Sequence, residues 1–113
     1  MKSLILAMMF CSSLAGAVTQ ITDRSFGDEV AHSKLPVVME FYAAWCGPCQ
    51  KAAPLVEEAE KRLKGKVKFV KLDVDESPHV GRMVDKLPTI AYIVPDKDSP
   101  SLPLAVHLMP MRL

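Results

Sequence analysis

Two cysteines, Cys46 and Cys49, lie three positions apart between an apolar run and an amphipathic stretch. The run 37–43 is apolar apart from one carboxylate, which predicts a central strand buried on both faces. Over residues 49–64 the apolar side chains recur at helical spacing, and Gly65 follows as a stop signal. The two thiols therefore lie at a strand-to-helix junction, where they can close a disulfide without a long loop.

The N-terminus of the predicted helix gives this pair its chemistry. Free N–H groups and a partial positive charge at this end favour a thiolate on Cys46, and the thiolate is the nucleophile in disulfide exchange. Cys49 lies one turn inside the helix, so we expect it to be less exposed and to react second. Pro48 fits the first turn because its missing N–H costs nothing there. These features predict a redox-active pair.

Three other interpretations of the two cysteines are weaker. A zinc site needs about four ligands, and the chain offers only His32, His79 and His107 in addition, without ligand spacing. A purely structural disulfide would close too small a loop to stabilise the fold much. A chance pair does not explain the strand-to-helix context or Trp45 directly before the motif. We therefore predict no metal site.

The rest of the chain alternates between predicted strands and helices, which indicates an α/β sheet. A first short helix is expected over 23–33, with Thr22 and Asp23 as its N-cap. A second is expected to begin at Ser77-Pro78 and to run through Val84. The further predicted strands are 67–74, 89–94 and 104–109.

Length and charge exclude several classes of protein. A chain of 113 residues allows one domain and leaves no room for two. Lys and Arg number 14, and Asp and Glu number 13. A nearly neutral chain lacks the field that nucleic acid or an anionic membrane would need, so we expect no nucleic-acid partner.

Residues 1–17 have the pattern of a secretory signal peptide. Lys2 precedes a short apolar run, and the small residues Ala15 and Ala17 follow it. The run is shorter than the roughly 20 residues that a membrane-spanning helix needs. We predict cleavage after Ala17, a domain over 18–113, and no stable membrane insertion after cleavage. Export implies a secreted or periplasmic location, which is oxidising.

The stretch 41–49, which contains the Cys-Gly-Pro-Cys motif, closely resembles the active-site stretch of thioredoxins. Pro54 falls where that family has its helix-kinking proline, and 71–75 resembles its central strand. Leu87-Pro88-Thr89 resembles its cis-proline segment. The likeness covers 37–94 and, with the signal peptide, is closest to the exported thioredoxin-like proteins. It implies the thioredoxin-like α/β fold, a central mixed sheet flanked by helices.

The resemblance also implies a substrate-binding surface around the cysteine pair. Pro88 would follow a cis peptide bond and pack beside Cys46, and its neighbours would meet an extended substrate segment. Trp45 is expected to be both a packing residue and a lid over the disulfide. The substrate contacts predicted in this way are Trp45, Gly47, Pro48, Leu87, Pro88 and Thr89.

Glu40 is the only charged residue in the run 37–43. A lone buried carboxylate is costly, so it should be protonated or paired; the alternative is a glutamate on an edge strand that faces solvent. The resemblance places Glu40 where thioredoxins carry a buried acid, usually Asp, and Lys71 at the partner lysine. It implies proton exchange with the Cys49 thiol. Glutamate is one methylene longer than Asp, which leaves the distance open.

The chain departs from the family after Val94. The prolines at 95, 100, 103 and 110 leave no room for the helix with which thioredoxins close one face of the sheet. We therefore expect the C-terminal closing helix to be missing and some apolar sheet surface to be exposed.

The function implied by the resemblance is thiol–disulfide exchange on protein disulfides outside the cytoplasm. Cys46 would attack, Cys49 would resolve the mixed disulfide, and an upstream thiol donor would supply electrons. No metal, flavin or nucleotide cofactor is needed. The Gly-Pro dipeptide resembles the reducing members of the family, which favours a disulfide reductase. A disulfide oxidase or isomerase, and a non-catalytic binding subunit, are the alternatives.

Overall fold

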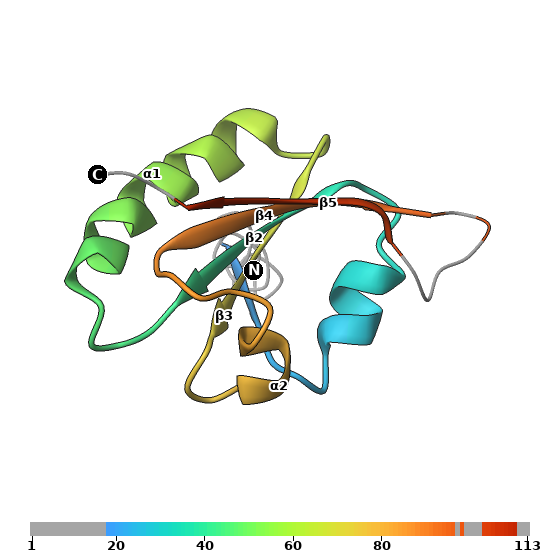
Figure 1. The fold of residues 1–113 in the computed structure, drawn as a ribbon. Helices are drawn as coiled ribbons and strands as arrows, with labels where there is room; N and C mark the ends of the chain where they lie inside the picture. Colours follow the sequence, from blue (N-terminus) through green and yellow to red (C-terminus); the bar gives the residue numbers. More distant parts are fainter. Residues whose placement is uncertain (1–17, 97, 99–102, 111–113) are drawn as a thin grey trace, which may run out of the picture.

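The computed structural model describes residues 18–96, 98 and 103–110 (Figure 1). The predicted signal peptide lies outside the described residues, so its cleavage after Ala17 stays a prediction. None of the described helices is both long and apolar enough to cross a membrane.

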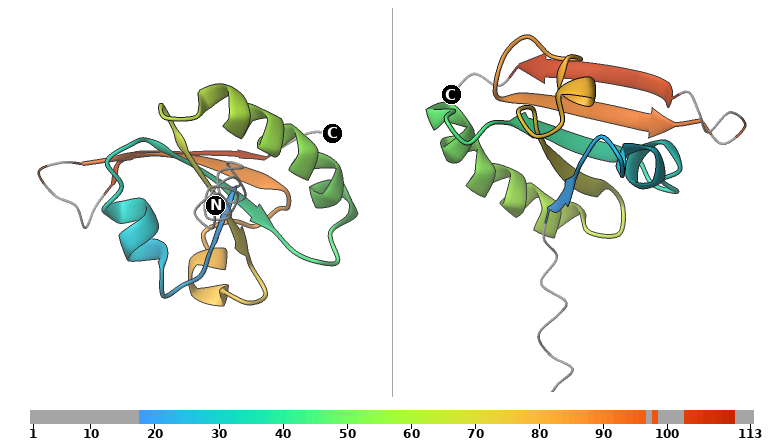
Figure 2. Two further views of the ribbon diagram at one scale, coloured as in Figure 1. Left: turned by 180° about the vertical axis from the view of Figure 1, so that it is seen from behind. Right: turned by 90° about the horizontal axis from the view of Figure 1, so that it is seen from below.

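The described strands form one mixed five-stranded sheet (Figure 2). Its order is β1 (Thr19–Ile21), β3 (Lys68–Asp73), β2 (Val37–Tyr42), β4 (Thr89–Pro95) and β5 (Pro103–Pro110). β2 is central, pairing in parallel with β3 and antiparallel with β4. The predicted central mixed sheet is confirmed, and the four predicted strands match the observed ones to within a residue at each end.

Helices cover both faces of this sheet (Figures 1 and 2). α1 (Gly47–Leu63) lies on one face, and η3 (Gly27–Ala31) and α2 (Pro78–Gly81) lie on the other. Pro54 is inside α1, as expected. Gly65 adopts a φ of 83°, a left-handed conformation that only glycine reaches at little cost, and this ends the helix where the sequence predicted.

The side chains of β2 alternate between these two faces. Val37, Met39 and Phe41 are fully buried in the core on the side of η3 and α2. Burying each of them contributes roughly 1.5–3 kcal/mol. Glu40 lies between Met39 and Phe41 in the strand, so its side chain points to the opposite face, on which α1 lies. A slip of one residue in register would drive its carboxylate into the apolar core, so the register of β2 is strongly specified.

On the face of the sheet that α1 covers, β4 and the edge strand β5 carry apolar side chains. Ile90 pairs with both Glu40 and Met109, which places all three on that face, and Met109 is 54% exposed. Among the described residues, α1 is the only helix on this face, and no helix follows β4. The expected exposure of apolar sheet surface is confirmed at Met109.

The predicted first helix is present but shorter than expected, and its predicted cap is wrong. In place of a regular helix over 23–33, the chain forms the five-residue π-helix η3. Asp23 does not cap it. Its Oδ1 accepts from the backbone N–H of Val80 at 2.8 Å and its Oδ2 from that of His79 at 3.1 Å, so this carboxylate caps α2. Ser77, the predicted cap of α2, makes no side-chain capping bond; its Oγ accepts from the Asp23 N–H at 3.1 Å.

The second predicted helix is shorter than expected. α2 ends at Gly81 rather than at Val84, because the N–H groups of Met83 and Val84 bond three residues back as isolated turns. A Cβ added at Gly81 would lie 3.0 Å from the Cβ of Val74, so the close approach of α2 to the end of β3 requires glycine.

We expect Asp23→Ala to lower the free energy of unfolding by about 1–2 kcal/mol, because it leaves two N–H groups of α2 without their acceptor. Urea unfolding of the oxidised protein measures the change. The matched control is Asp28→Ala, an exposed acid of η3, which should cost no more than a few tenths of a kcal/mol. Equal costs for the two variants would contradict the capping role.

Candidate active site

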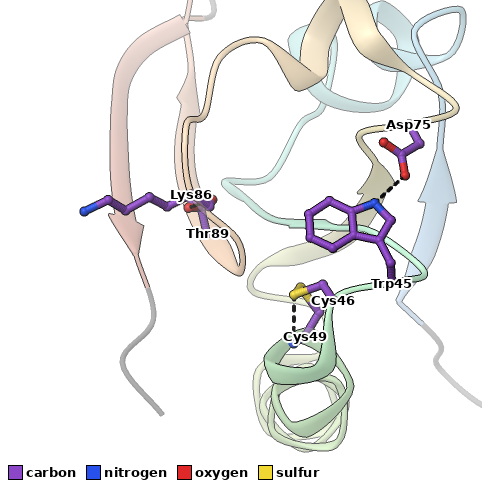
Figure 3. The surroundings of a disulfide bond; sticks show 6 residues. All are labelled: Trp45, Cys46, Cys49, Asp75, Lys86 and Thr89. Atoms are coloured by element: carbon purple, nitrogen blue, oxygen red, sulfur yellow. Dashed lines mark hydrogen bonds between the residues drawn. A yellow bond between two sulfur atoms is a disulfide. The ribbon is translucent and has the colours of Figure 1, made fainter.

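Cys46 and Cys49 form a disulfide at the N-terminus of α1, with their Cα atoms 5.3 Å apart (Figure 3). Cys46 is the N-cap of the helix, and its Sγ accepts a hydrogen bond from the backbone N–H of Cys49 at 3.2 Å. An N–H group and a helix N-terminus that both point at this sulfur favour negative charge on it once the disulfide is reduced.

The expected difference in exposure between the two cysteines is wrong. Both are 4% exposed. The reason is that both belong to one small apolar cluster with Ala43, against which Val74 and Leu87 pack. In this oxidised state the two sulfurs are therefore distinguished by the hydrogen bond to Cys46 and by their helix positions rather than by burial.

The segment before β4 runs beside this cluster. The Leu87–Pro88 peptide bond is cis, as expected, and Pro88 is buried. Leu87 packs against the disulfide cluster. The buried hydroxyl of Thr89 donates to the carbonyl of Lys86 at 2.6 Å, so it is used to hold the loop closed (Figure 3).

The exposed surface next to the disulfide is made by Trp45, Gly47 and Pro48. Trp45 is 71% exposed, so its expected packing role is wrong. Its indole Nε1 instead donates to Oδ2 of Asp75 at 2.7 Å, and Figure 3 shows the ring beside the disulfide. Asp75 was not predicted as a site residue. The only sequence signal for it is its position two residues after β3.

A groove of about 280 Å³ begins at this tryptophan. Its lining includes Trp45, Val74 and Leu87, and it extends to Asp85 and Lys86. Of the six predicted substrate contacts, Trp45 and Leu87 line this groove.

A second cavity, of about 230 Å³, lies on the other side of the disulfide, beneath Cys49. Glu40, Tyr42 and Lys71 line it together with Cys49. Glu40 is 3% exposed in the central strand, so the alternative of a solvent-facing edge glutamate is wrong. The structure thus brings three of the four predicted catalytic residues to one cavity.

Burial raises the pKa of Glu40 above its ordinary value. The positive charge of Lys71, which lies opposite Glu40 on β3, counteracts part of this rise, and the negative charge of Glu57 adds to it. A buried carboxyl group whose pKa is raised holds a proton more readily than an exposed one, which suits it to proton exchange.

Tyr42 also lines this cavity, and Gln20 is hydrogen-bonded to it; neither residue was predicted as a site residue. The Lys71 ammonium lies 5.8 Å from the centroid of the Tyr42 ring. Gln20 of β1 donates from Nε2 to the Tyr42 hydroxyl oxygen.

A further cavity, of about 640 Å³, lies at the opposite end of the sheet and is lined by none of the predicted site residues. Within the described part of the chain, no three His, Cys, Asp or Glu residues gather as metal ligands.

Comparison with known proteins shows which family has this sequence pattern. The thioredoxin family pattern matches residues 17–102. The chain belongs to the thioredoxin family. It is 50% identical over 60 residues to the thioredoxin of Rickettsia felis, a match that covers 53% of this chain and 57% of that protein. It is 43% identical over 76 residues to the thioredoxin of Synechocystis sp., covering 66% of this chain and 71% of that protein.

Solved thioredoxin structures have a similar fold. Chloroplastic thioredoxin z superposes with a TM-score of 0.71 at 30% identity, covering 84% of this chain and 81% of that one. The Trx4 domain of ERdj5 superposes with a TM-score of 0.71 at 27% identity, covering 82% of each chain. The thioredoxin fold predicted from the sequence is therefore confirmed.

We expect Glu40→Gln to stabilise the oxidised protein more at pH 8 than at pH 4. Because the pKa of Glu40 is raised in the folded state, the folded chain binds more protons than the unfolded chain between the two pKa values. Stability is therefore lost as the pH rises through that window, and an amide removes the loss. Urea unfolding at the two pH values measures the difference.

The matched control for this experiment is Glu76→Gln, which changes an exposed carboxylate. Its effect on stability should differ little between the two pH values. A Glu40→Gln effect that is equally large at both would show that the buried carboxyl does not titrate as described.

Proposed function

We propose that this protein reduces disulfide bonds in protein substrates through the Cys46–Cys49 dithiol. The observation that carries the proposal is the position of Cys46 as the N-cap of α1, with its sulfur accepting the Cys49 N–H at 3.2 Å. The same sulfur belongs to the cluster against which the cis-proline loop packs. Membership in the thioredoxin family supports this chemistry.

In the first step, the Cys46 thiolate attacks one sulfur of a substrate disulfide. A bond forms between Cys46 and that sulfur, the substrate disulfide breaks, and the second substrate sulfur leaves as a thiolate that takes a proton from solvent. The helix N-terminus lowers the cost of the attacking thiolate. The groove lined by Trp45 and by Leu87 of the cis-proline loop holds the substrate segment.

In the second step, Cys49 resolves the mixed disulfide. Its thiol gives a proton to the Glu40 carboxylate, and its sulfur attacks Cys46. The Cys46–Cys49 bond forms, and the first substrate sulfur leaves as a thiolate. Two electrons pass to the substrate, and the protein is left in the oxidised state that the structure describes. Lys71 favours the ionised form of Glu40 and so keeps the carboxylate ready to accept the proton.

Turnover requires an upstream thiol donor that reduces the Cys46–Cys49 disulfide again. The redox-active disulfide is the only cofactor in this scheme. We place the reaction outside the cytoplasm, in a secreted or periplasmic location, because residues 1–17 have the pattern of a signal peptide.

The two cysteines should fail differently when replaced. We expect Cys46→Ser to capture no substrate, because no thiolate remains to begin the attack. Cys49→Ser should attack but not release its partner, so mixed disulfides should accumulate. Each reduced variant is incubated with insulin, whose disulfides are intact. On non-reducing gels the adducts are additional bands that disappear with reductant.

The wild-type protein is the control, and it should reduce insulin in the presence of a dithiol donor without retaining adducts. Trapping by Cys46→Ser alone would reverse the two roles. If neither variant traps a partner and the wild type reduces nothing, the protein is a binding subunit rather than a reductase. If the protein does exchange disulfides, its redox potential, measured by equilibration with glutathione, separates a reductase from an oxidase.

The proposed location predicts a mature N-terminus at Val18. Small residues at Ala15 and Ala17 after a short apolar run define the cleavage point. The intact mass of protein recovered from the extracytoplasmic fraction measures it, and a substitution of Ala17 by a bulky residue should block processing. Exported protein that retains residues 1–17 would contradict this prediction.

A further inference from the structure

A hydrogen bond on the α1 face of the sheet joins two strands that are not neighbours. Gln20 belongs to β1 and Tyr42 to β2, and β3 lies between these strands. The Nε2 group of Gln20 nevertheless donates to the hydroxyl oxygen of Tyr42. The two side chains together must therefore pass over β3. We refer to this Gln20–Tyr42 contact as the strap.

The residue of β3 at this crossing is Lys71. The register places it directly opposite Gln20 on one side and directly opposite Glu40 on the other. Tyr42 lies two residues beyond Glu40 on the same face of β2. The Lys71 ammonium lies 5.8 Å from the centroid of the Tyr42 ring, within the range of a cation–π contact.

The strap also borders the cavity beneath Cys49, because Tyr42 and Lys71 are both part of its wall. Lysine has a long and flexible side chain, and this one is only half-buried. The Tyr42 ring gives its ammonium a fixed place at the cavity, and Gln20 fixes the ring. Burial raises the pKa of Tyr42, so the ring remains an uncharged phenol at neutral pH.

We propose that the strap is a positioning device that holds the Lys71 charge at the Glu40 cavity and so sets the pH range in which Glu40 can accept a proton. Tyr42 and Gln20 act through Lys71 and do not touch the reacting sulfur atoms. The consequence for resolution by Cys49 rests on the proposed function. The effect on the titration of Glu40 does not.

Other groups that face Glu40 also influence whether its carboxyl is ionised. α1 contributes Cys49 at the cavity and the negative charge of Glu57. β4 contributes the apolar side chain of Ile90, which lies opposite Glu40. Lys71 is the only one of these groups that favours the ionised carboxyl, so its position has a large influence on when Glu40 ionises.

The test is a titration of Glu40 by carbon NMR in the full-length oxidised protein. Cys49 does not titrate in the disulfide, so the measurement isolates the carboxyl group. Glu40→Gln identifies its signal. We expect Tyr42→Leu to move the Glu40 midpoint up by about half a pH unit, because Lys71 loses the ring and turns to solvent. Gln20→Ala, a change at an exposed position, should move it in the same direction by less.

A double-mutant cycle shows whether the strap acts through the lysine. Lys71→Met should raise the midpoint more than Tyr42→Leu does, and adding Tyr42→Leu to it should change nothing further. The matched control is Tyr92→Leu, which removes a half-buried tyrosine from the same face of β4, and it should leave the midpoint where it is.

The proposal is overturned if Tyr42→Leu leaves the midpoint unchanged or lowers it, or if its effect persists in the Lys71→Met background. It is also overturned if Tyr92→Leu has the same effect. A protein that reduces no disulfide still gives this titration, so failure of the proposed function and failure of the strap are distinguishable. In a protein that does reduce them, the rate of mixed-disulfide resolution should show the same upward shift in its pH profile.

Discussion

The position of β2 in the middle of the sheet is the constraint on which the rest of the structure depends. Its pairing on both sides fixes its register, and its alternation assigns one face to the apolar core and the other to the redox chemistry. Because α1 begins five residues after the strand ends, the sulfur atoms are held at the edge of a sheet that cannot shift. The cis-proline loop reaches the same edge because β4 pairs with β2.

The same strand carries a destabilising group. Nothing about packing requires a carboxyl at Glu40, since its neighbours in β2 are mostly apolar and the site is closed to solvent. A buried acid weakens the fold whenever it is ionised. The positive charge of Lys71 on β3 offsets part of this loss of stability. It does not offset all of it, because burial has the larger effect on the pKa of Glu40. Stability lost at such a position is typical of groups retained for reactivity.

Much of the fold could be predicted from the sequence because its signals are local. The apolar run of β2, the stripe of α1 and the stop at Gly65 are each complete within one element, and the cis-proline segment was recognisable by its resemblance. The failures involve partners far apart in the chain. Asp23 caps a helix more than fifty residues away, and the exposed Trp45 donates a hydrogen bond to Asp75, thirty residues away. β1 was missed because three residues are too few to show a period.

In the candidate active site, too, residues with a local sequence signal could be predicted and residues placed by distant contacts could not. Cys46, Cys49 and Glu40 could be predicted as candidate site residues, since each is conspicuous against its surroundings. Gln20 and Tyr42 could not. Gln20 is an ordinary polar residue in a short strand, and its contact with Tyr42 exists only because β1 and β2 flank the same strand. No pattern within either segment indicates that contact.

The tryptophan beside the disulfide has a practical consequence. The chain contains a single Trp, so its tryptophan fluorescence comes from one indole, and that indole belongs to the residue directly before Cys46 (Figure 3). The ring is exposed and held by one hydrogen bond. The protein therefore carries its own optical reporter of whether the disulfide is open or closed, without any added label.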